Sequence, residues 1–221
     1  MSPEGRHDGP VRPARHPRGD PPANAAQPRE AFVERRTRET SIELSLSLEG
    51  GEVALEDPRA LGFFGHMLNA LASYAGLGLR LSLNGDPWVD LHHSVEDVGL
   101  VLGQALAQAL GDYSGHARFG WALVPMDESL AEAAVDLGRR PFLHFGVEWP
   151  QPRTGDFELC LVEEFFRAFC QKAGMTLHLL GRHGRNSHHL CEALFKSVGL
   201  ALGQALASRS QEGPFSTKGA L

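Results

Sequence analysis

The strongest constraint on the fold of this chain is that its sequence repeats. The segment VGLVLGQAL at residues 98–106 recurs as VGLALGQAL at residues 198–206. A His-His-x-x-Glu motif at residues 92–96 recurs at residues 188–192, at nearly the same offset. Self-similarity at a constant spacing indicates a duplicated structural unit. We therefore expect two homologous halves, which we place at residues 35–130 and 131–221.

Hydrophobic periodicity predicts the same order of elements in both halves. Polar and apolar residues alternate in the predicted strands, which cover residues 41–48, 77–83, 135–147 and 175–180. Apolar residues at helical spacing mark the predicted helices, which cover residues 63–74, 94–110, 161–172 and 188–207. The fold class expected from these patterns is α+β, in two tandem half-domains.

Residues 1–34 have neither periodicity. Seven of the chain's 14 prolines lie there, interleaved with Arg, Gly and Asp, which predicts a disordered tail. The tail has no apolar core of a secretory signal, and it contains too many acids for an organelle transit peptide. Three cysteines without CxxC spacing are typical of thiols in a reducing compartment. We therefore expect a cytoplasmic protein.

Composition excludes several classes of function. An apolar fraction of 42% is enough for a hydrophobic core, but no apolar run approaches the roughly 20 residues that cross a bilayer. A net charge of −6 makes the chain a poor binder of phosphate backbones. We therefore expect neither a membrane protein nor a nucleic-acid-binding protein.

The repeated His-His-x-x-Glu motif points to metal binding. On a helix, residues three and four apart share a face, so one histidine of each pair can meet Glu96 or Glu192. Adjacent histidines point about 100° apart, so each pair serves two ions more easily than one. A single copy would be better explained by helix-end histidines with an acidic partner, but two copies favour metal. Imidazole with carboxylate suits Mn²⁺, Fe²⁺ or Zn²⁺. By themselves, His66 and His178 are more typical of core histidines.

The chain resembles the imidazoleglycerol-phosphate dehydratase family from about residue 36 to its end. The segments that carry the resemblance are RET at 38–40, HML at 66–68, HHSVEDVG at 92–99, PMDESL at 125–130, GDF at 155–157, EEFF at 163–166, NSHH at 186–189, FK at 195–196 and STKG at 216–219.

The resemblance implies a fold, a site and a reaction. Each half would be a β-sheet backed by two helices, within a homo-oligomer of 24 subunits whose sites lie between subunits. The reaction would dehydrate imidazole glycerol phosphate to imidazole acetol phosphate, in histidine biosynthesis, with two Mn²⁺ ions per chain. The implied metal ligands are His66, His92, His93, Glu96, His178, His188, His189 and Glu192. The implied phosphate contacts are Arg118, Arg140, Lys196, Ser216, Thr217 and Lys218. Glu39 would be an acid or a base, and Asp127 and Glu128 would serve structure or support a ligand.

Two departures from the family pattern leave an alternative open. Gly65 and Leu91 stand where the family usually has aspartates before ligand histidines. If those aspartates orient the ligands, their loss could cost about 10–100-fold in affinity or rate. The alternative is therefore a non-catalytic or impaired dehydratase-like protein that binds metal and assembles. A dinuclear hydrolase of another fold is disfavoured, because such sites are usually rich in aspartate.

Overall fold

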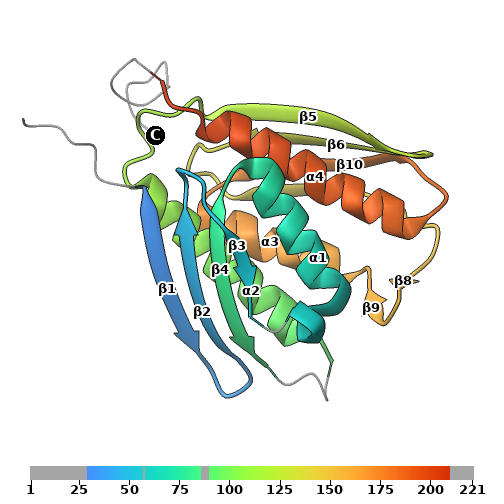
Figure 1. Ribbon diagram of the computed structural model, residues 1–221. Coiled ribbons are helices and arrows are strands. Elements are labelled where there is room, and N and C mark those ends of the chain that lie inside the picture. The colour runs from blue at the N-terminus through green and yellow to red at the C-terminus, as the bar shows by residue number, and fades with distance from the viewer. Residues whose placement is uncertain (1–28, 57, 86–89, 210–221) are drawn as a thin grey trace, which may run out of the picture.

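The computed structural model describes residues 29–56, 58–85 and 90–209, in which two four-stranded sheets enclose a layer of helices (Figure 1). The first sheet has the order β1 (Glu30–Arg36), β2 (Ser41–Ser47), β4 (Gly78–Asn84), β3 (Val53–Leu55). The second has the order β5 (Phe119–Met126), β6 (Ser129–Asp136), β10 (Thr176–His183), β7 (Phe142–Gly146). The helices are α1 (Pro58–Ala75), α2 (His92–Leu110), α3 (Leu161–Ala173) and α4 (Ser187–Leu206). A small ladder joins β8 (Arg153–Thr154) to β9 (Phe157–Glu158).

The two sheets have the same topology. In each sheet three strands are antiparallel, and the fourth pairs in parallel, β3 with β4 and β7 with β10. Helices α1 and α2 pack on the first sheet, and α3 and α4 pack on the second. The α+β fold with helix-backed sheets is therefore confirmed. In the part of the chain that the structure describes, no helix is both long and apolar enough to cross a membrane.

Alternating residues build the core between the sheets. In β2, Ile42, Leu44 and Leu46 are buried, while the intervening Ser and Glu side chains face outward. The buried apolar side chains form one cluster between the sheets, in which the ring of Phe195 in α4 lies 4.9 Å from that of Phe166 in α3 between centroids. Each such side chain stabilises the fold by about 1.5–3 kcal/mol through burial.

The repeated VGLxLGQAL segments explain how the helix layer packs. Each segment places two glycines four residues apart on one helix face. An added Cβ at Gly99 or Gly103 of α2 would lie 2.6 or 2.5 Å from a backbone oxygen of α3. At Gly199 of α4, it would lie 2.7 Å from the Leu71 oxygen of α1. The absence of a side chain therefore lets the helix backbones approach closely.

We expect Gly103→Ala to destabilise the protein by about 1–3 kcal/mol, the usual cost of overpacking. Alanine favours a helix over glycine by about 1 kcal/mol. The cost of the clash should exceed this gain, because the Phe169 oxygen belongs to the backbone of α3 and cannot move without the helix. Gly203→Ala is the matched control, since its nearest contact is 3.0 Å from Ala75 O. Urea midpoints at one protein concentration measure both. Equal losses would contradict this explanation of the repeated motif.

Two predicted domain boundaries differ from the structure. Residues 30–34, which were expected to belong to the tail, form part of strand β1, and residues 1–28 lie outside the described residues. The boundary at residues 130 and 131 falls inside β6. Because β6 pairs with β5 along its whole length, sheet membership places the division between Leu110 and Phe119.

A buried histidine lies in the connection between the halves. His116 is 2% exposed, and its Nε2 has no hydrogen-bond partner among the described atoms. Burial lowers the pKa of His116, because the charged form is poorly solvated there. As pH falls, His116 is therefore protonated more readily in the unfolded chain than in the folded one. Its contribution to the stability of the folded state falls as pH drops below about 6.5, the usual pKa of histidine.

We expect His116→Phe to reduce the loss of stability between pH 7.5 and pH 5.5. Urea midpoints of both proteins at the two pH values measure this difference, with other histidines contributing equally to each. An unchanged pH dependence would show that His116 does not contribute.

Candidate metal centre

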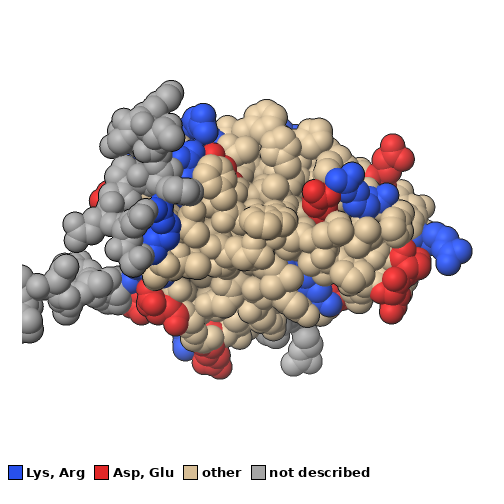
Figure 2. Space-filling view, turned by 90° about the horizontal axis from the view of Figure 1, so that it is seen from above, with Lys and Arg blue, Asp and Glu red and all other residues tan. Residues whose placement is uncertain are grey.

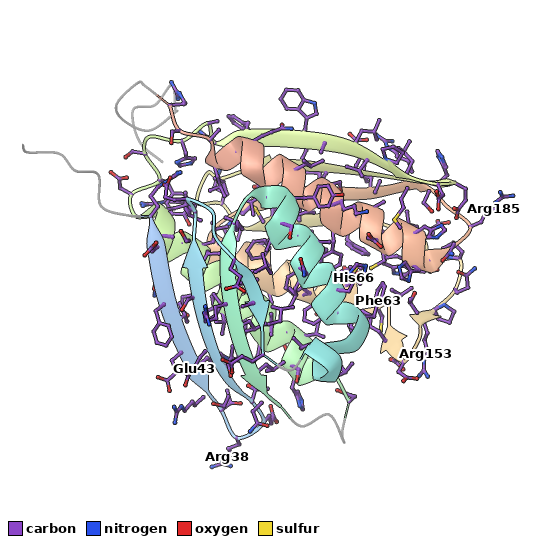
Figure 3. All side chains as sticks on the ribbon, in the orientation of Figure 1. Arg38, Glu43, Phe63, His66, Arg153 and Arg185 are labelled. Carbon is purple, nitrogen blue, oxygen red and sulfur yellow. The ribbon has the colours of Figure 1, made fainter. Side chains whose placement is uncertain are left out.

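A histidine of α1 meets the N-terminal part of α4. His66 Nε2 lies 3.2 Å from Glu192 Oε2, and His188 Nε2 lies 3.3 Å from the same oxygen. Figure 3 shows His66 and Phe63 on the side of α1 that faces α4, and the Phe63 ring packs on that of His188 at 5.0 Å. Among the described residues, this is the only group of three potential ligands that lie close enough to hold one ion.

The carboxylate of this group, that of Glu192, is held in its ionised form. Lys196 Nζ contacts Glu192 Oε1 at 2.7 Å, which leaves Oε2 toward the two histidines. Burial opposes ionisation of Glu192, but the hydrogen bonds of Lys196 and His66 outweigh it and lower the pKa of Glu192. The same contact raises the pKa of Lys196. The group thus combines two imidazoles with an ionised carboxylate, a donor set that transition metals accept.

Adjacent histidines diverge, as helix geometry predicts. The ring planes of His92 and His93 are at 89°, and those of His188 and His189 are at 85°. In each motif the first histidine faces its Glu, because His92 Nε2 lies 3.7 Å from Glu96 Oε2, as His188 does from Glu192 at 3.3 Å. The second histidine faces elsewhere, and each motif therefore offers ligands in two directions.

His189 is held by the turn between β5 and β6. Its Nδ1 lies 2.9 Å from Glu128 Oε2, while Glu128 Oε1 accepts hydrogen bonds from the backbone N–H groups of Arg185 (3.1 Å) and Asn186 (2.8 Å). The hydrogen bond of His189 is the main reason why the pKa of Glu128 is lowered to about 2. Glu128 thereby fixes both His189 and the loop that leads into α4, while Nε2 of the ring faces Asp127 Oδ2 at 3.7 Å.

Glu39 lies beside the corresponding end of α2. Its carboxylate is 3.8 Å from His93 Nδ1. Thr37 Oγ1 accepts hydrogen bonds from the backbone N–H groups of Glu39 (3.1 Å) and Thr40 (2.9 Å), and Thr40 Oγ1 donates to Asp97 of α2. These contacts tie the turn that carries Glu39 to α2.

His178 lies apart from the other predicted ligands. It is exposed on β10, on the outer face of the second sheet, whereas α4 covers the inner face. The sheet therefore separates His178 from His188 and Glu192 within one chain.

Two predicted phosphate contacts meet at one carboxylate. Arg118 Nε lies 2.6 Å from Asp136 Oδ1, and Arg140 Nη2 lies 3.2 Å from Asp136 Oδ2. Arg118 is buried, and its backbone has a φ of 72°, which residues other than glycine rarely adopt. The guanidinium groups are thus held close together. The predicted contacts Ser216, Thr217 and Lys218 lie outside the described residues.

The arginines are far from the metal-binding group of the same chain. The Arg118 N–H donates to Ala205 O near the C-terminal end of α4, thirteen residues beyond Glu192. At 1.5 Å per residue, about 20 Å of helix separates the two places. Of the predicted phosphate contacts within the described residues, only Lys196 lies beside the group, where it pairs with Glu192.

The chain is similar to known proteins in both sequence and overall fold. Residues 60–202 match the family model described as imidazoleglycerol-phosphate dehydratase. The proteins of that name from Desulfitobacterium hafniense and Streptococcus sanguinis are 48% and 49% identical, each over 87% of this chain and 98% and 100% of their own lengths. A crystal structure of the Staphylococcus aureus enzyme aligns with a TM-score of 0.73 and 35% identity, over 81% of this chain and 99% of that one. IGPD from Pyrococcus furiosus in complex with (S)-C348 gives the same TM-score at 33% identity, over 86% of this chain and 100% of that one.

Proposed function

Because this chain belongs to the imidazoleglycerol-phosphate dehydratase family, we propose that it removes water from imidazole glycerol phosphate to give imidazole acetol phosphate, as a cytoplasmic step of histidine biosynthesis. The observation that carries the proposal is the group of His66, His188 and Glu192. The duplicated motif offers a second set of ligands on α2. A hydro-lyase with two metal sites per chain accounts for both.

We propose that the chain binds two Mn²⁺ ions, since imidazole and carboxylate groups together suit this metal. The proposed ligands are imidazoles and carboxylates, namely His66, His92, His93, Glu96, His178, His188, His189 and Glu192. Bound manganese would supply a Lewis acid for the imidazole ring of the substrate. The reaction also needs a group that takes the C–H proton and a group that protonates the departing hydroxyl, both within hydrogen-bond reach. Glu39 is our assignment for one of these roles, since it lies beside the proposed ligand His93.

We infer that each active site takes its metal ligands and its phosphate contacts from several subunits. Within one chain, the second sheet lies between His178 and Glu192, and about 20 Å of helix lies between Glu192 and the arginine pair. A substrate with three carbons between its ring and its phosphate cannot span that distance. An assembly in which neighbouring chains supply the missing groups removes this difficulty, and we propose the 24-subunit homo-oligomer that the family resemblance implies.

An exposed apolar surface supports the assembly. The outer face of the second sheet carries Phe119, Trp121, Leu123 and Phe142, with Trp121 70% exposed. Figure 2 views the molecule from the side of this sheet and shows a broad area with few charges. Apolar patches of this kind mark interaction surfaces.

The test of the function is to incubate Mn²⁺-loaded protein with imidazole glycerol phosphate and follow the enolisable ketone product. We expect the protein to form imidazole acetol phosphate with multiple turnovers per chain. If metal binds and the oligomer forms but no product appears, the alternative of a non-catalytic assembly protein is favoured. Leu91 then becomes the first residue to examine, since it precedes α2 and its side chain makes no capping hydrogen bond.

We expect Glu128→Gln to weaken metal binding by about 10–100-fold, the usual effect of losing the partner that orients a ligand histidine. Glutamine can still accept from the backbone N–H groups, but its amide cannot replace a carboxylate at His189. Glu132→Gln is the matched control, since Glu132 is a carboxylate of the adjacent strand β6 that pairs with Arg182. Equilibrium dialysis with Mn²⁺ measures both. Equal affinities for both variants would refute the orienting role.

A further inference from the structure

A second pair of histidines lies outside the group that carries the proposed function. His178 on β10 and His144 on the parallel strand β7 are direct partners in the strand register. Both side chains are exposed on the outer face of the second sheet. Their ring centroids are 5.3 Å apart, closer than the 6.1 Å between His66 and His188.

The separation of the rings suits one shared metal ion. Zn²⁺ binds imidazole nitrogens at about 2.0–2.1 Å in tetrahedral geometry, which places the centroids of two ligand rings about 5.2 Å apart. The backbone already holds the two histidines side by side, because strand pairing fixes their positions. Binding therefore needs adjustment of exposed side chains and not of the fold.

The neighbouring residues leave room for an ion and further ligands. The partner of His178 on the other side is Ala134 of β6, whose small side chain separates His178 from Trp121 on β5. Two positions beyond His144 on the same face lies Gly146, where an added Cβ would be 3.4 Å from His144 Nε2. An alanine and a glycine thus flank the pair, and the ring of Phe142 lies on a third side, 5.8 Å from that of His178 between centroids.

We propose that His144 and His178 together bind one divalent ion of the imidazole-preferring class, for which Zn²⁺ is the probe. The inference rests on the proposed function in one respect, since His178 is there a manganese ligand. In that assembly, His144 adds an imidazole to the ion that His178 holds. Because Zn²⁺ stands far above Mn²⁺ in the order of affinities for nitrogen ligands, the added imidazole favours Zn²⁺ at this position.

A double-mutant cycle in Zn²⁺ binding tests the pair on the full-length protein. The proteins are the natural chain, His144→Val, His178→Val and the double variant, freed of metal and titrated with Zn²⁺ by calorimetry. Valine suits exposed strand positions, so the sheet should be retained, and thermal unfolding checks this. The matched control is His183→Val, an exposed histidine of β10 whose register partner is Leu130.

We expect His144→Val to weaken one Zn²⁺ site by about tenfold or more, since even indirect partners of ligands contribute about 10–100-fold. The same substitution should have no effect in the His178→Val background, because both histidines hold the same ion. His183→Val should bind Zn²⁺ like the natural chain.

Two results would overturn the proposal: unchanged Zn²⁺ binding by His144→Val, or additive effects of the two substitutions. The outcome is independent of the proposed reaction. A protein that fails to dehydrate imidazole glycerol phosphate but shows the cycle expected here refutes the proposed function alone.

Discussion

Replacing Glu39 with glutamine is expected to lower the turnover of imidazole glycerol phosphate by about 10²–10⁴-fold, the usual contribution of a positioned acid or base. The carboxylate lies 3.8 Å from His93, and hydrogen bonds of Thr37 and Thr40 hold its turn against α2. Glutamine has nearly the same shape, but it can neither accept nor donate a proton at that position. Steady-state kinetics with Mn²⁺-saturated protein measures the effect, and bound metal is quantified in the same samples.

The matched control is Glu43→Gln. Glu43 is an exposed carboxylate of the neighbouring strand β2, and its ion pair with Arg36 is long, at 3.6 Å (Figure 3). This variant should turn over substrate like the natural protein. If Glu39→Gln loses metal in proportion to activity, Glu39 supports a ligand and does not transfer a proton. If it retains both metal and activity, the catalytic assignment is wrong.

The second large effect is expected from mixing two inactive variants. Glu192→Gln removes the carboxylate of the metal-binding group, and Arg140→Ala removes an exposed member of the arginine pair. Each oligomer alone should lose about 10²-fold or more in rate, as when one group that stabilises developing charge is removed. Because the two places lie far apart in one chain, a composite site takes them from different subunits. When the two variants are co-assembled in equal amounts, about a quarter of the sites should therefore receive an intact Glu192 from one subunit and an intact Arg140 from another, and these sites should be active.

The control mixture combines Glu192→Gln with His188→Ala. These residues contact each other in one chain, at 3.3 Å, so every mixed site keeps a defect in the same group. Activity should not return. If the first mixture also stays inactive although tagged subunits show that the oligomers are mixed, each site belongs to a single chain. The inference of shared sites then fails, while the proposed reaction is still tested by the unmixed natural protein.

Much of this fold could be predicted from the sequence, because it depends on local backbone geometry. The duplicated segments predicted two equivalent α+β halves, and the structure shows two sheets of identical topology. Helix geometry predicted that histidines adjacent in sequence diverge and that one of each pair meets a glutamate four residues on. Both follow from 3.6 residues per turn, whatever the helix packs against. The predicted helix over 161–172 agrees with Leu161–Ala173 for the same reason.

Strand β1 shows where local patterns are insufficient. Its sequence EAFVERR has one fully buried residue, Val33, and charged side chains at both ends. An edge strand with one neighbour needs few apolar residues, so its pattern resembles that of a polar tail. Its pairing with β2 becomes visible only when the sheet is assembled.

Only the tertiary structure decided which distant residues meet. His66 reaches Glu192 across 126 residues because α1 packs on α4, and glycines of α4 make that approach close. Strand register placed His144 beside His178, and the turn before β6 brought Glu128 to His189. Such contacts depend on how whole elements pack and not on the spacing of residues along one of them. Spacing therefore predicted which residues could bind a metal, and packing determined which of them lie close together.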